Sequence, residues 1–228
     1  GLHSGQLSRN PTAWGVWALP EQELNVLGDV RGKDILEFGC GAAQWAIGLS
    51  ASARRVVGMD LSGGQLRHAR RAVTDSAANV ALVQASGEHT PFADASFDIV
   101  FCDHGAMTYA KPQRTVAEAG RLLRSGGRFA FNMNSPFHTT CWDERADKLT
   151  TRLVNNYFTR RIIKDELTDS FTLPYGKWIR LFRRHNFIVE NLIEPRPPAD
   201  AHTTYKGYAS RTWARKWPAE CIWVLTKS

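Results

Sequence analysis

The chain has 228 residues, of which 43% are hydrophobic, and its formal net charge at pH 7 is +7. This length allows one domain with a sizeable core, and the composition is typical of a globular protein, which argues against a disordered or fibrous class. No apolar run reaches the roughly 20 residues of a membrane-crossing helix, and the four cysteines lie far apart, which argues against a zinc knuckle and a disulfide scaffold.

The net positive charge comes from the last third of the chain. Residues 1–150 hold 15 Lys and Arg against 15 Asp and Glu, whereas residues 151–228 hold 14 against 7. These charges are scattered over helix-like segments, so they fit a solvated surface as well as a face for an acidic substrate or nucleic acid. We expect a cytoplasmic protein with reduced cysteines, no bound metal and no membrane contact.

The first predicted elements are a strand, a tight turn and a helix in "DILEFGCGAAQWAIGL", residues 34–49. Glycines at such a turn allow a ligand to approach the backbone and leave the first N–H groups of the helix free for polar groups, so the turn predicts a nucleotide cofactor. The dinucleotide fingerprint needs Gly or Ala at its sixth position, but counting from Gly39 that position is Gln44. A nicotinamide cofactor is therefore disfavoured.

Strands and helices then alternate, which predicts a mostly parallel, doubly wound sheet with helices on both faces. The second strand ends at Asp60, 21 residues after Gly39, where a carboxylate can accept hydrogen bonds from ribose hydroxyls. Ser62 is a plausible N-cap for the helix that follows. Gly126 and Gly127 are expected to stop a later helix and start the fifth strand. The predicted strands are 34–38, 54–60, 79–84, 96–103 and 128–133, and the predicted helices between them are 62–75 and 113–124.

The alternation breaks after Met133, where a long polar and aromatic stretch suggests an inserted cap. A helix at 175–186 and strands at 187–195 and 220–228 follow, and the two strands are expected to pair as an antiparallel hairpin with a short helix in their connection. We expect a single domain in four parts. These are an N-terminal lid and lead-in (1–33), a cofactor-binding core (34–133), a cap insertion (134–176), and a C-terminal helix with the terminal strands (177–228).

Three stretches together resemble the class I, Rossmann-like methyltransferases that use S-adenosylmethionine. They are "EFGCGAA" (37–43), "ASGEHTPFADASFDIVFCDHG" (85–105), similar to the family's "GDAExLPFxDxxFDxV", and "RLLRSGGRFAF" (121–131). The resemblance covers most of the chain and implies an α/β, Rossmann-like fold with an antiparallel C-terminal strand. Ala43 replaces a frequent third glycine, and Ser86 replaces the acid that commonly meets the adenine amino group.

The resemblance also implies a set of cofactor-binding residues, which follow the ends of the first four strands. They are Glu37, Gly39, Cys40, Gly41, Asp60, Leu61, Gln65, Ser86, Gly87, Glu88, Asp103 and His104. Trp14 and Trp17 precede the first strand. Either they fold over the site as a lid with an aromatic face near the sulfonium, or they pack in the core.

His104, directly after the fourth strand, is our first candidate for a general base, and His138, just past the fifth, is the second. The alternative for His104 is that it only shapes the cofactor loop. A base helps when the acceptor is a hydroxyl, whereas an acceptor that is already a good nucleophile needs none. His185 and His68 are expected on helix surfaces.

The cap favours a small-molecule acceptor with a hydroxyl or amine. Amino-methyltransferases that act on nucleic-acid bases carry a proline-containing acidic or amide motif after the fourth strand, where this chain has "CDHG", so nucleic acid is not the expected partner; "NSPF" follows the fifth strand instead. Two alternatives stay open. One is an RNA methyltransferase that uses the basic last third, and the other is a non-catalytic partner of the same fold.

Overall fold

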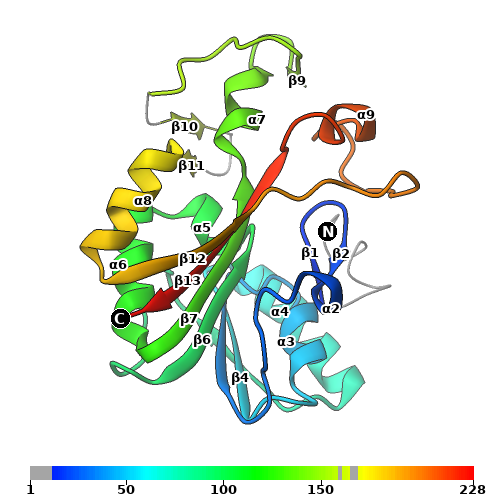
Figure 1. Cartoon of the computed structure of the whole chain (residues 1–228). Helices are drawn as coiled ribbons and strands as arrows, with labels where there is room; N and C mark the ends of the chain where they lie inside the picture. Colours follow the sequence, from blue (N-terminus) through cyan, green and yellow to red (C-terminus); the bar gives the residue numbers. More distant parts are fainter. Residues whose placement is uncertain (1–11, 159–160, 165–168) are drawn as a thin grey trace.

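The computed structural model describes residues 12–158, 161–164 and 169–228, and its centre is a seven-stranded sheet in the order β12-β13-β7-β6-β3-β4-β5 (Figure 1). Strands β5, β4, β3, β6 and β7 are parallel, and β13 is antiparallel to both of its neighbours. The predicted fold class is therefore confirmed. The strands are β3 (Asp34–Phe38), β4 (Arg55–Asp60), β5 (Val80–Gln84), β6 (Phe97–Asp103), β7 (Leu123–Asn134), β12 (Phe187–Ile193) and β13 (Glu220–Lys227).

Helices cover both faces of the sheet (Figure 1). Helices α3 (Gln44–Leu49) and α4 (Gly63–Ser76) pack on one face, and α6 (Pro112–Leu122) and α8 (Tyr175–Arg184) pack on the other. Alternate strand residues enter each layer, as the period of two requires. The Ser62 hydroxyl accepts the N–H of Gln65 at 3.2 Å, so the predicted N-cap of α4 is confirmed. Leu66 and Ala69 of that helix are fully buried.

The glycine pair does not end α6, contrary to the sequence-based expectation. The helix ends at Leu122 and β7 begins at Leu123, because Leu123 is buried and pairs with Phe97 of β6. The pairing register of β6 with β7 shifts after Phe97, and Gly126 lies within the shifted part at φ +74°. The glycines therefore form an irregularity inside the strand. A short helix, α5 (Gly105–Tyr109), follows β6 in a stretch for which no element was predicted.

The segment after β7 begins with α7 (Pro136–Cys141) and the short hairpin β8 (Trp142–Asp143)–β9 (Lys148–Leu149), and a second hairpin, β10 (Arg161–Lys164)–β11 (Asp169–Thr172), follows. The connection between β12 and β13 contains α9 (Arg211–Ala214), so the predicted antiparallel hairpin and its short helix are both confirmed. Helices α7 and α9 and strand β9 lie beyond the end of the sheet where the parallel strands terminate (Figure 1).

The N-terminal part lies beside this end of the sheet and consists of β1 (Ala13–Trp14), β2 (Leu19–Pro20) and α2 (Glu21–Leu24). The turn between β1 and β2 packs with α9 and α7 in a small apolar cluster that contains Trp17, Cys141 and Trp213. This cluster is separate from the two layers of the sheet. In the part of the chain that the structure describes, no helix is long and apolar enough to cross a membrane.

Candidate functional site

The glycine turn after β3 is packed more tightly than the sequence suggests. The N–H groups of Gly39 and Cys40 both donate to the Met59 carbonyl at 2.8 Å, so these two are not free for a ligand. A Cβ on Gly39 would lie 2.6 Å from the backbone nitrogen of Ala106 in α5, so this glycine permits the approach of α5. The Cys40 side chain is buried against Gly58, which leaves only its backbone at the turn.

The open part of the turn lies at Gly41, where an added Cβ would meet no atom within 4 Å. The Asp60 carboxylate at the end of β4 accepts the N–H of Gly41 at 2.9 Å and the N–H of Ser62 at 2.8 Å, one on each oxygen. Because each oxygen has a second lone pair, Asp60 can still accept two hydroxyl groups. Leu61 is 69% exposed beside it, and Gln65 is exposed in the first turn of α4. A carboxylate next to an uncovered apolar side chain fits a nucleoside.

The loop after β5 is tied to the helices that follow β6. Ser86 Oγ accepts the N–H of Glu88 at 3.2 Å, and Glu88 Oε1 accepts the N–H of Lys111 at 3.0 Å. A Cβ on Gly87 would lie 2.8 Å from the Ala106 side chain, so glycine is needed for this packing. The structure therefore places the predicted residues Ser86, Gly87 and Glu88 around α5, next to the glycine turn.

Glu37, at the end of β3, is a buried carboxyl group that accepts the N–H of Ala46 at 3.0 Å. Burial raises the pKa of Glu37 well above its usual range, and the nearby charges of Asp103 and Asp60 raise it further. These three acidic groups thus gather at the carboxyl ends of three neighbouring strands, β3, β4 and β6. Such a cluster favours a positively charged ligand there.

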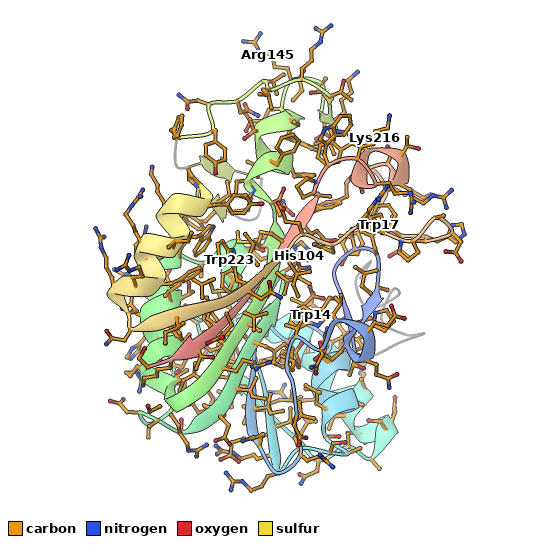
Figure 2. The ribbon with its side chains drawn as sticks, viewed as in Figure 1. Trp14, Trp17, His104, Arg145, Lys216 and Trp223 are labelled. Atoms are coloured by element: carbon orange, nitrogen blue, oxygen red, sulfur yellow. The ribbon has the colours of Figure 1, made fainter. Side chains whose placement is uncertain are left out.

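The two N-terminal tryptophans take different positions (Figure 2). Trp14 is 1% exposed and packs on Trp45 and Phe101 with ring centroids 4.8 and 6.1 Å apart. It is therefore a core residue and does not form the expected lid, because its indole fills the layer between the sheet and α3. Trp17 is also buried, but it belongs to the cluster with Trp213 at the end of the sheet.

His104 caps α5 in the left-handed conformation, with φ 60°. Its Nε2 lies 2.6 Å from Oε1 of Glu220, whose side chain is 2% exposed and also accepts the N–H of Val16 and the Asn132 amide. Burial lowers the pKa of His104, but the hydrogen bond to Glu220 and its charge outweigh this, and the pKa is raised overall. Burial likewise raises the pKa of Glu220, yet the bond from His104 makes the net direction downward. The two form a polarised pair.

Asp103 and Glu220 are joined by one amide and covered by one turn. Asn132 Nδ2 donates to Asp103 at 2.9 Å and to Glu220 at 2.8 Å, and the N–H of Gly15 donates to Asp103 at 3.1 Å. Glu220 and Asn132 were not among the site residues predicted from the sequence. No local signal marks them, because only the pairing of β13 with β7, in which Glu220 faces Asn134, brings the carboxylate to this position.

His138 lies in α7 within an aromatic cluster. Its ring stacks on Tyr208 with centroids 4.6 Å apart and on Trp142 at 5.7 Å, and its Nε2 lies 3.1 Å from the Tyr208 carbonyl oxygen. Burial lowers the pKa of His138 to about 4, so the ring is neutral at pH 7. Its catalytic role stays a prediction, as do the roles of the other predicted site residues. Across residues 12–158, 161–164 and 169–228, no group of three or more His, Cys, Asp and Glu is arranged to hold a metal.

The chain is similar to known methyltransferases in sequence and in structure. Residues 36–131 match a family described as a methyltransferase domain. An S-adenosylmethionine-dependent methyltransferase from Mesorhizobium loti has a similar structure, with a TM-score of 0.72, 19% sequence identity and 100% coverage of both chains. That likeness shows a shared fold.

Sequence relatives match a shorter part of the chain. A demethylmenaquinone methyltransferase from Lactococcus lactis is 31% identical over 106 residues, which are 45% of this chain and 42% of that protein. A ubiquinone biosynthesis O-methyltransferase from Aromatoleum aromaticum is 34% identical over 104 residues, which are 45% of this chain and 44% of that protein. The chain therefore matches less than half the length of each of these two relatives.

Proposed function

Because the chain contains a methyltransferase domain of the class I, S-adenosylmethionine-dependent family, we propose that it transfers the methyl group of this cofactor to a hydroxyl or amine of a small molecule. The proposal rests on two features at the carboxyl ends of the parallel strands. One is the Gly41–Asp60 turn, and the other is a histidine that is hydrogen-bonded to a buried carboxylate. The names of two relatives, a demethylmenaquinone and a ubiquinone-biosynthesis methyltransferase, favour a small acceptor.

The residues around the glycine turn fit the parts of the cofactor. Asp60 has lone pairs left for the ribose hydroxyls, and exposed Leu61 offers an apolar contact to adenine. The charges of Asp103 and Asp60 raise the pKa of buried Glu37, so a sulfonium or ammonium group bound beside these residues would favour the ionised form of Glu37. When bound, the cofactor supplies a methyl group on a positive sulfur that is a good leaving group. The protein has to align the acceptor with it and exclude water.

His104 is placed to take the proton of a hydroxyl acceptor. In the neutral ring, an Nε2–H that donates to Glu220 leaves Nδ1 as the proton acceptor, and the side chain is 18% exposed. Glu220 acts through His104 by fixing the orientation of the ring and raising its basicity, the arrangement of a histidine oriented by a carboxylate. An amine acceptor that is already unprotonated would not need this base.

The proposal is tested by a turnover screen in which demethylated cofactor is measured against a library of small phenols, acids and amines. We expect release of the demethylated cofactor with a subset of hydroxyl or amine acceptors and none without acceptor. If the cofactor binds but no acceptor promotes its turnover, the non-catalytic alternative replaces the proposal. Structured RNA belongs in the same screen, since methylation of RNA with a steep salt dependence would replace a small acceptor with RNA.

A further inference from the structure

A cavity of about 620 Å³ lies at the end of the sheet beside the N-terminal turn, and Trp17 is the one predicted cofactor-site residue among those that line it. Its walls come from the β1–β2 turn, from β9, from residues 201–207 and from the start of α9. Trp17, which is labelled in Figure 2, is the lining residue that the β1–β2 turn contributes. The volume is within the usual range for sites that bind small molecules.

The floor of the cavity is aromatic and its rim is cationic. Trp17 and Trp213 are 5% and 6% exposed, and Tyr205 is half-buried. The exposed side chains of Lys148, Lys206 and Arg211 also line it. No Asp or Glu is among the lining residues that the structure describes, so the cationic rim is not neutralised from within. Because aromatic rings bind flat apolar bodies and the rim attracts negative charge, the two features select different parts of one ligand.

The proposed base does not itself line the cavity, and Tyr205 is the lining residue that relates the cavity to the surroundings of His104. Burial raises the pKa of Tyr205, and the charges of Asp103 and Glu220 raise it further, which places the phenol near both carboxylates. Tyr208, three residues later, has its ring centroid 6.3 Å from that of His104. The indole N–H of Trp17 is buried and has no acceptor among the described residues. Tyr205 and Tyr208 therefore lie between the cavity and the surroundings of His104.

We propose that this cavity is the acceptor subsite and that it selects an aromatic small molecule with a carboxylate, whose ring lies on Trp17 and Trp213 and whose carboxylate meets Lys206 and Arg211. The role of the cavity as an acceptor site rests on the proposed function. Its preference for a carboxylate can be measured by binding alone, without turnover. In this proposal the basic C-terminal part of the chain determines the specificity for the acceptor. The acceptor would enter as an anion and present its hydroxyl on the side of Tyr205.

The test compares hydroxybenzoates with the matching hydroxybenzamides, which have the same shape but no charge. Binding is measured by quenching of tryptophan fluorescence and by calorimetry, with the demethylated cofactor present. We expect each carboxylate to bind about tenfold more tightly than its amide, because it forms two solvent-exposed ion pairs that the amide lacks. The preference should weaken with added salt.

Substitutions at the rim of the cavity test which residues cause the preference for a carboxylate. The double variant K206Q/R211Q should lose it, whereas K216Q should keep it, because Lys216 lies over the Trp217 ring and does not line the cavity. Lys206 and Arg211 are exposed, so the double variant is expected to fold, and K206R/R211K, which keeps both charges, should restore the preference. Equal binding of acid and amide, a preference that survives in K206Q/R211Q, or no binding of either compound at millimolar concentration would overturn the inference.

Measurements of methyl transfer distinguish a failure of this inference from a failure of the proposed function. A carboxylate preference in binding without methyl transfer to any compound would contradict the proposed activity and leave the subsite in place. Methyl transfer to neutral acceptors at the same rate as to their acids would contradict the subsite and leave the activity in place.

Discussion

The cofactor half of the chain, residues 34–133, and the part after it, residues 134–228, are held together in different ways. In the first, the polar groups of the site bond to nearby backbone, as Asp60 does to Gly41 and Glu37 to Ala46. In the second, polar groups reach across the chain, as Glu220 does to His104, 116 residues away. The cofactor turn is therefore built locally, whereas the base depends on contacts that only the complete fold supplies.

This difference assigns different tasks to the two parts. The hydrogen bonds of the Gly41–Asp60 turn come from residues of the cofactor half itself, which suits a cofactor that does not change. The second part carries most of the positive charge excess of the chain and most of the lining of the cavity beside Trp17. In our account it supplies the acceptor site and Glu220, which orients the base His104 of the first part. Substitutions at the Gly41–Asp60 turn and at the His104–Glu220 pair should therefore separate cofactor affinity from turnover.

The largest expected effect is on turnover. His104→Ala should lower it by about 10²- to 10⁴-fold with a hydroxyl acceptor, the usual contribution of a general base. Cofactor affinity should stay almost unchanged, because the Gly41–Asp60 turn is intact. His68→Ala, at an exposed position of α4, is the matched control. Steady-state kinetics and calorimetry on both variants check this, and a joint loss of affinity and turnover would mean that His104 only shapes the cofactor loop.

The Gly41–Asp60 turn should show the opposite pattern. Asp60→Ala removes the acceptor of the Gly41 and Ser62 N–H groups and of the ribose hydroxyls, so cofactor binding should weaken by roughly 1.5 to 3 kcal/mol. Asp75→Ala, an exposed acid later in α4, should leave the affinity unchanged. Calorimetry and thermal unfolding are measured together. Normal affinity in a folded Asp60→Ala protein would return this residue to a role in the turn alone.

His138 should make stability depend on pH. Its pKa is about 4 in the folded protein and about 6.5 when unfolded, so the unfolded chain binds the proton more readily and stability is lost as pH falls from about 6.5 to about 4. Between pH 7.5 and pH 5 the loss from this residue is about 2 kcal/mol. Denaturant unfolding at both pH values should show that loss in the wild type and not in His138→Phe. An equal loss in both proteins would contradict the buried, neutral state of this ring.

The smallest expected effect is a displaced pH profile. Glu220 raises the pKa of His104, and the base works only when unprotonated, so Glu220→Gln should move the acid limb of turnover to lower pH. Turnover on the alkaline plateau should fall less than in His104→Ala, since the ring is still present. Rates across pH with saturating cofactor measure both quantities. An acid limb that stays in place would show that Glu220 does not act through His104.

The two parts also differ in how well the sequence predicted them. The bounds of β3, Asp34–Phe38, were predicted correctly because five buried residues end directly at a glycine turn. Helix α5 was missed, since its five residues have no helical period of their own and pack against the Gly39 turn. Of the two alternatives left open for Trp14, the structure shows packing in the core, which composition alone does not indicate.

Glu220 could not have been found from its surroundings in the sequence. It begins an apolar strand, where a charged residue usually faces solvent. The antiparallel register of β13 on β7 places its carboxylate beside the Asn132 amide and the His104 ring, and that register is a property of the folded sheet. Contacts over such separations are set by tertiary packing, which no local pattern records.

The central claim is that the site at the carboxyl ends of β3 and β4 binds S-adenosylmethionine. Calorimetry of the wild-type protein with S-adenosylmethionine, its demethylated product and a nicotinamide dinucleotide tests it most directly. We predict one site for the first two ligands, with no detectable binding of the dinucleotide, whose fingerprint is broken at Gln44. Tighter binding of the dinucleotide than of S-adenosylmethionine would contradict the account.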